Sequence, residues 1–150
     1  MTLSITYDQL PDLAGTDLGY TEYRTITQEQ VNLFADATDD HQWIHVDPER
    51  AKEGPFGGPI AHGFLSLSLG IPFWTELLDV QGVSMKVNYG LDRVRFPAPV
   101  AVGSRIRMRA VVAEVTPVPG GYQITVDQTI EIEGEAKPAV AARALYRFYA

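Results

Sequence analysis

The stretch from Pro55 to Thr75 restricts the fold of this chain most, because it contains no Asp, Glu, Lys or Arg. The apolar residues from Ile60 to Leu78 fall on nearly every side of a helix, and a helix that is apolar all round is buried. Glycine, proline, serine and histidine interrupt the run, whereas a membrane span needs roughly 20 predominantly apolar residues. We therefore predict a core helix, kinked or ended near Pro72, and no membrane association.

Beyond Gly82 the apolar residues recur at every second position, which is typical of strands with one buried face. In the clearest segment, residues 104–115, they alternate with Arg105, Arg107 and Arg109. About four such strands joined by turns predict an antiparallel sheet. The expected fold class is α+β, with this sheet wrapped around a long central apolar helix.

The sequence before this helix contains start and stop signals for shorter elements. Thr27 and Gln30 match a capping box, so a helix is expected to begin there and to end near Asp39. Asp47 as N-cap and Pro48 as first residue predict a second, short helix. Residues 1–19 are expected to form an irregular surface arm and residues 20–26 a first strand. Residues 53–59 are expected to form a loop.

Length and composition limit the classes of protein to consider. A chain of 150 residues is most simply one domain, residues 1–150, with a real core. It has no cysteine, which excludes disulfides, thiolate catalysis and cysteine metal sites and fits a cytoplasmic location. Its net charge of -7 argues against a nucleic-acid partner. Its first residues do not follow the pattern of a signal peptide.

The chemistry is concentrated in residues 36–63, which hold all three histidines of the chain. Asp40 and His45 are candidates for an acid–base pair, because a turn between them can aim both side chains at one water molecule. Imidazole suits the task since its pKa lies near neutral, and the aspartate would need partial burial. The alternatives are a carboxylate in a helix-ending turn and a packed, hydrogen-bonded core histidine.

Gly63 opens the apolar helix, where free backbone N–H groups can bind an anionic oxygen. The alternative is that this glycine only permits tight packing of helix on sheet. His62 is expected to be structural or a lid contact, and His41 to lie at the surface or behind the site. A metal site made of Asp40 and the three histidines is conceivable but not favoured.

For other polar residues the sequence predicts only general roles. Ser66 and Ser68 can hydrogen-bond a substrate, although bonding to the preceding helical turn is commoner. Arginines of the later strands are candidates for binding coenzyme A phosphates, but a solvated strand face is the simpler reading. They are Arg93, Arg95, Arg105, Arg107 and Arg109.

Three motifs resemble the MaoC-like family of (R)-specific enoyl-CoA hydratases. DHQWIH (Asp40 to His45) resembles the hydratase signature D-x-N-P-[aliphatic]-H, and GPIAHG (Gly58 to Gly63) the second motif of the family. VNYGLDRVRFPAPVAVGSRI (87–106) resembles the third block of the nodulation protein N-like subgroup. The resemblance extends roughly from residue 20 to the end. Gln42 and Trp43 depart from the usual Asn and Pro, which leaves substrate preference open more than reaction class.

The resemblance implies a hot-dog fold, in which an antiparallel sheet wraps one long helix. It implies an (R)-specific enoyl-CoA hydratase/3-hydroxyacyl-CoA dehydratase that acts as a homodimer on acyl-CoA thioesters, without a separate cofactor. Asp40 and His45 would be catalytic, Gly63 would supply the oxyanion N–H, and Gln42 would orient the others. The alternatives are an acyl-CoA thioesterase on the same fold and a non-catalytic acyl-CoA-binding module.

Overall fold

The computed structural model describes residues 1–150. Its helices are the 3-10 helix η1 (Tyr7–Leu13), α1 (Gln28–Thr38), α2 (Trp43–Val46), α3 (Pro48–Lys52), α4 (Gly63–Ser68) and α5 (Gly70–Leu77). Its strands are β1 (Leu3–Thr6), β2 (Asp17–Tyr20), β3 (Arg24–Thr25), β4 (Leu78–Gln81), β5 (Met85–Arg95), β6 (Arg105–Val118), β7 (Gly121–Ile132) and β8 (Val140–Tyr149). No helix combines the length and the apolar character needed to cross a bilayer.

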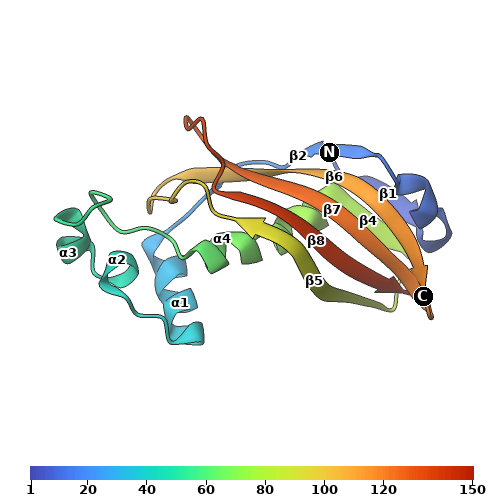
Figure 1. The fold of residues 1–150 in the computed structure, drawn as a ribbon, viewed down its shortest axis with the longest axis horizontal. Helices are drawn as coiled ribbons and strands as arrows, with labels where there is room; N and C mark the ends of the chain where they lie inside the picture. The colour runs from blue at the N-terminus through green and yellow to red at the C-terminus, as the bar shows by residue number, and fades with distance from the viewer.

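Six strands form one sheet in the order β2-β6-β7-β8-β5, with β3 also paired to β6. Every neighbouring pair in this sheet is antiparallel. The sheet curves over α4 and α5, while α1, α2 and α3 gather at one end of the molecule and both termini lie at the other (Figure 1). The expected hot-dog fold, an antiparallel sheet around a central apolar helical segment, is confirmed.

The inner face of the sheet carries the core, as the alternating pattern predicts. On β6 the four inward residues are completely buried: Ile106, Met108, Ala110 and Val112. Burial of a side chain such as Ile106 or Val112 contributes about 1.5–3 kcal/mol to stability. Arg107 and Arg109 between them face outward and pair with carboxylates of the neighbouring strands β7 and β2. The alternation in the sequence therefore predicted correctly which residues of this strand face the core and which face outward.

The central helix differs from the expected single, fully buried rod. It is interrupted at Leu69 and resumes at Gly70, so that Pro72 lies in the first turn of α5, where its missing N–H costs least. The helix ends at Leu77, and the next residues form β4 instead of extending the helix. Phe64 is 69% exposed and Ile71 38% exposed, so one side of this segment is not covered within the protomer.

The N-terminal segment is more ordered than the sequence suggested. β1 pairs in parallel with β4, and Leu10 and Leu13 of η1 are buried in the core, so the expectation of an irregular surface arm is wrong. The three-residue spacing of these leucines matches a 3-10 turn. The expected strand over 20–26 is instead two short strands, β2 and β3, with a gap between them.

The predicted helix starts are confirmed. The Thr27 side chain accepts a hydrogen bond from the Gln30 N–H at 3.1 Å, and Asp47 accepts one from the Arg50 N–H at 3.1 Å. Asp39 ends α1 in the left-handed region, with φ of 59°. The sequence reasoning missed α2, a single turn too short to show a period.

Candidate active site

Asp40, His45 and His62 meet at the end of the molecule where α1, α2 and α4 converge. The left-handed residue Asp39 turns the chain at the end of α1, so that Asp40 begins the segment leading to α2. One ligand atom each of Asp40, His45 and His62 lies within 4.8 Å of the others. The structure thus brings the predicted carboxylate and imidazole together, with Asp40 partly buried, and adds a second imidazole.

His45 is held in one orientation and one tautomer. Its Nδ1 lies 2.7 Å from the Ile60 carbonyl oxygen, and since a carbonyl only accepts hydrogen bonds, Nδ1 carries the proton. Nε2 therefore has a free lone pair and has no hydrogen-bond partner within the chain. Burial lowers the pKa of His45, against the opposing effect of the Ile60 hydrogen bond, so the ring is neutral near neutral pH. A neutral imidazole with a bare Nε2 can accept a proton.

His62 fixes the relative positions of the other two residues. Its Nε2 donates to the backbone carbonyl of Asp40 at 3.0 Å, and its ring stacks on His45 at 3.9 Å between centroids, tilted by 24°. Phe34 packs on the same ring at 4.8 Å between centroids. His62 is 3% exposed, and its Nδ1 has no partner in the chain. This placement agrees with the expected structural role, although the contact with Asp40 was not foreseen.

A cavity of about 310 Å³ lies beside His45. Gly63 and Ser66 of α4 and Phe96 beyond β5 contribute to its walls. Gly63 is the first residue of α4, so its N–H has no carbonyl partner in the helix. A Cβ at this position would lie 2.9 Å from the Phe96 ring, so a larger residue would have to displace that ring, which also lines the cavity. His45 and Gly63 thus face one space large enough for part of a substrate.

The serines of α4 behave differently from each other. Ser68 is exposed and donates to the Phe64 carbonyl at 2.7 Å, which is the expected bond to the preceding turn. Ser66 is 2% exposed and lines the cavity, and its hydroxyl makes no hydrogen bond within the chain. Only Ser66 therefore keeps a hydroxyl group available near His45.

Gln42 and Trp43, the two residues of the signature that depart from the usual pattern, have different surroundings. The Gln42 side chain is exposed and forms no hydrogen bond, whereas its carbonyl accepts from the His45 N–H at 3.0 Å. Its orienting role stays a prediction. Trp43 packs under the Arg50 guanidinium at 4.4 Å and against Gly54, where a Cβ would lie 2.8 Å from the indole. Trp43 therefore joins α2 to the following loop by packing.

Sequence reasoning missed Gln28, which is 17 residues before His45 and carries no motif. Its Nε2 donates to the His45 carbonyl at 2.8 Å and so ties α1 to α2. His41 is exposed, as expected, beside Asp36 at 2.8 Å and Asp39 at 3.4 Å. No spacing rule could identify Gln28, because its partner is a backbone atom in another helix.

The geometry of the two imidazoles bears on whether this site could bind a metal ion. A carboxylate and two histidines form a possible donor set. Nitrogen lone pairs lie in the ring planes, and the two rings are stacked and tilted by only 24°. The lone pairs of His45 and His62 therefore lie in two nearly parallel planes, which is a poor arrangement for binding one ion. The absence of a metal stays our prediction.

The MaoC like domain family matches residues 10–134 of the chain. The chain belongs to this family. The MaoC-like protein is 52% identical over 149 residues to 3-hydroxyacyl-thioester dehydratase Z of Mycobacterium tuberculosis strain H37Rv, covering 97% of this chain and 99% of the relative. It is 48% identical over 136 residues to nodulation protein N of Rhizobium leguminosarum bv. viciae, covering 89% and 84% of the two chains.

Solved structures agree with the fold of the MaoC-like protein. An (R)-hydratase from A. caviae involved in PHA biosynthesis superposes with a TM-score of 0.70 and 25% identity, covering 89% of this chain and 94% of the other. The resemblance read from the three motifs is thereby confirmed at the level of family and fold.

Proposed function

We propose that this MaoC-like protein adds water reversibly across the double bond of trans-2-enoyl thioesters, as an (R)-specific hydratase and 3-hydroxyacyl-thioester dehydratase. The observation that carries the proposal is the bare Nε2 of a neutral, buried His45 beside the Asp40 carboxylate, at a cavity that Gly63 also lines. The names of the dehydratase and hydratase relatives support the reaction class.

In the proposed hydration, His45 Nε2 takes a proton from water as the water oxygen bonds to C3 of the substrate. The Asp40 carboxylate accepts a hydrogen bond from the other O–H of this water, which stays on the oxygen, and stabilises the imidazolium. The electrons of the double bond move to the thioester oxygen, which the Gly63 N–H stabilises as an oxyanion. The imidazolium then protonates C2, so no net proton is released. Because no electron is transferred, the reaction requires no redox cofactor.

The test is to follow two signals while purified protein acts on crotonyl-CoA. Hydration removes the absorbance of the enoyl group and releases no thiol. Thiol release without change at the double bond would identify a thioesterase instead. Tight acyl-CoA binding without either signal, for any chain length, would identify a non-catalytic binding module.

We also propose a homodimer. β5 is an edge strand of the sheet, and edge strands expose unpaired backbone groups that favour pairing. It carries exposed apolar side chains, including Met85 at 52% and Tyr89 at 54%, and the exposed side chains Phe64 and Ile71 of α4 and α5 add to the apolar surface. A second copy on this edge would cover them.

Sedimentation or light scattering should give a mass of twice 16.5 kDa. Met85→Asp with Tyr89→Asp places charges on the exposed edge and should yield the monomer. Leu33→Asp, at a residue 63% exposed on α1, is the matched control and should keep the dimer. A monomeric wild-type protein would rule the dimer out.

Two broader expectations belong to the same proposal. We propose that residues 1–150 form a single unit, which the family match over 10–134 and the shared core from Leu10 to Phe148 support. The substrate is proposed to be a coenzyme A thioester. A cytoplasmic location stays a prediction from the cysteine-free composition.

A further inference from the structure

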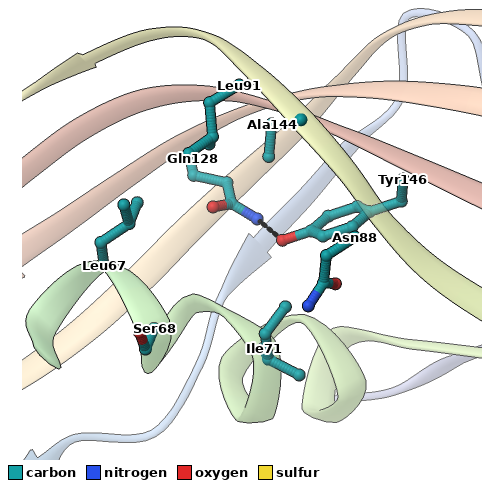
Figure 2. A pocket seen from close by; sticks show the side chains of 9 residues that line it. Leu67, Ser68, Ile71, Asn88, Leu91, Gln128, Ala144 and Tyr146 are labelled. Carbon is teal, nitrogen blue, oxygen red and sulfur yellow. Dashed lines mark hydrogen bonds between the residues drawn. The ribbon is translucent and has the colours of Figure 1, made fainter. Parts of the chain in front are cut away.

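A second cavity of about 310 Å³ lies between the helical segment α4–α5 and the strands β5, β7 and β8. Figure 2 shows Leu67 and Ile71 of the helices on one side, and Gln128, Ala144 and Tyr146 of the sheet on the other. Most of its walls are apolar, but two of the buried side chains that line it are polar. Gln128 is 3% exposed and Tyr146 is 6% exposed.

Gln128 and Tyr146 are hydrogen-bonded to each other in a way that leaves further groups free. The Gln128 Nε2 donates to the Tyr146 hydroxyl oxygen at 2.6 Å (Figure 2). The tyrosine is the acceptor in this bond, so its own O–H proton is available. Neither that proton nor Gln128 Oε1 has another hydrogen-bond partner in the chain. The pair therefore presents one donor and one acceptor beside the cavity.

Packing keeps this pair in place. The Tyr146 ring stacks on Trp74 at 5.2 Å between centroids. Gly70 leaves room for the glutamine, since a Cβ there would lie 3.1 Å from Gln128 Oε1. Burial raises the pKa of Tyr146, so its hydroxyl stays protonated as a donor. Such a fixed arrangement can distinguish ligands, because its groups do not rotate away from an unsuitable partner.

The position of this cavity relates it to Gly63. Leu67 lies about 6 Å and Ile71 about 12 Å along the helical segment from Gly63, at about 1.5 Å per residue. With carbon–carbon bonds of about 1.5 Å, an extended acyl chain of roughly six to ten carbons spans such a distance. Ala144, a small residue on the inner face of β8, lines the cavity at this distance.

We propose that this second cavity is a distal acyl subsite that recognises a hydroxyl group on the chain of the thioester substrate. A hydroxyl accepts from the Tyr146 O–H and donates to Gln128 Oε1, which satisfies both free groups. A plain alkyl chain would remove water from these groups and replace none of their hydrogen bonds, which is unfavourable. The inference rests on the proposed hydratase function and adds a class of substrate to it.

The test compares trans-2-enoyl-CoA substrates of six, eight and ten carbons with and without a terminal hydroxyl group. For wild-type protein, kcat/KM should be about tenfold higher for the hydroxylated member at one of these lengths. Tyr146→Phe removes only the hydroxyl donor and should abolish this ratio. Tyr122→Phe is the matched control, because Tyr122 packs on Tyr7 away from the cavity and should leave the ratio unchanged.

The outcomes separate this inference from the proposed function. If crotonyl-CoA is not hydrated by wild-type protein, the proposed function fails. If crotonyl-CoA is hydrated but the plain chain is preferred at every length, only the distal subsite is overturned. A Tyr146→Phe protein that folds and keeps the wild-type ratio would overturn it as well. The preference of the wild-type protein decides the question even if the variant does not fold.

Discussion

The site and the outer face of the sheet use polar residues in opposite ways. At the site, three buried or partly buried side chains bind backbone carbonyls: Gln28 to His45, His45 to Ile60, and His62 to Asp40. On the outer face, arginines pair with exposed carboxylates, as Arg143 does with Asp127. Buried polar groups lose much when a partner is removed, whereas exposed ion pairs contribute little. The difference predicts where substitutions will matter.

The largest effect is expected at the two proposed catalytic residues. Asp40→Asn and His45→Gln each remove an acid–base group and should lower kcat for crotonyl-CoA hydration by about 10²–10⁴-fold. Circular dichroism should show that the fold is retained. Losses below about tenfold would discard the assignment of this pair.

The next largest effect concerns His62. His62→Phe keeps an aromatic ring against His45 and Phe34 but leaves the Asp40 carbonyl without its donor. The free energy of unfolding should fall by about 1–3 kcal/mol, measured by urea denaturation. His41→Phe, at an exposed histidine, is the control and should stay within about 0.5 kcal/mol of wild type. Equal effects of both substitutions would contradict the contrast between buried and exposed groups.

The pH dependence of activity and stability tests the contrast between buried and exposed groups in a further way. Burial lowers the pKa of His45 below its ordinary value of 6.5, so the neutral base persists into mildly acidic solution. The acidic limb of kcat/KM should therefore lie below pH 6.5. Below pH 6.5 His45 binds a proton in the unfolded chain but not in the folded one. As the pH falls from 6.5 to the lower pKa of the folded state, the contribution of His45 to stability therefore decreases. An acidic limb above pH 6.5 would contradict a buried neutral base.

The smallest effect is expected on the outer face. Arg143 binds Asp127 through two hydrogen bonds of 2.8 and 2.9 Å, but both side chains are almost half exposed. Arg143→Gln should change the free energy of unfolding by only about 0–1 kcal/mol. Added salt should reduce even this difference, since it screens exposed charges. A loss above about 2 kcal/mol would show that this outer pair is not a simple surface interaction.

The sheet could be predicted from the sequence because its signal is local and repeats. Met108 and Arg109 alternate with their neighbours, and alternation alone assigns the two faces of a strand. The caps of α1 and α3 were predictable for a similar reason, since Thr27 and Asp47 act within three residues. The structure of the N-terminal segment was not predictable in this way, because β1 pairs with β4, which begins only at Leu78.

The site was predictable only in part. The motif indicated Asp40, His45 and Gly63, and the structure places the first two together and the last beside the same cavity as His45. Their catalytic roles stay predictions. The contacts of Gln28 and His62 could not be read from the sequence, because each joins a side chain to a distant backbone oxygen. Such bonds leave no pattern of residue types.

The order of strands in the sheet has a consequence for how the chain is made. β2 and β3 pair with β6, and β5 pairs with β8, so each leaves the ribosome long before its partner exists. Pairing between segments so far apart in sequence is slow to form. The nascent protein must therefore hold several unpaired strands until translation reaches its final segment. Chaperone binding during synthesis would shield these strands from aggregation until β8 emerges.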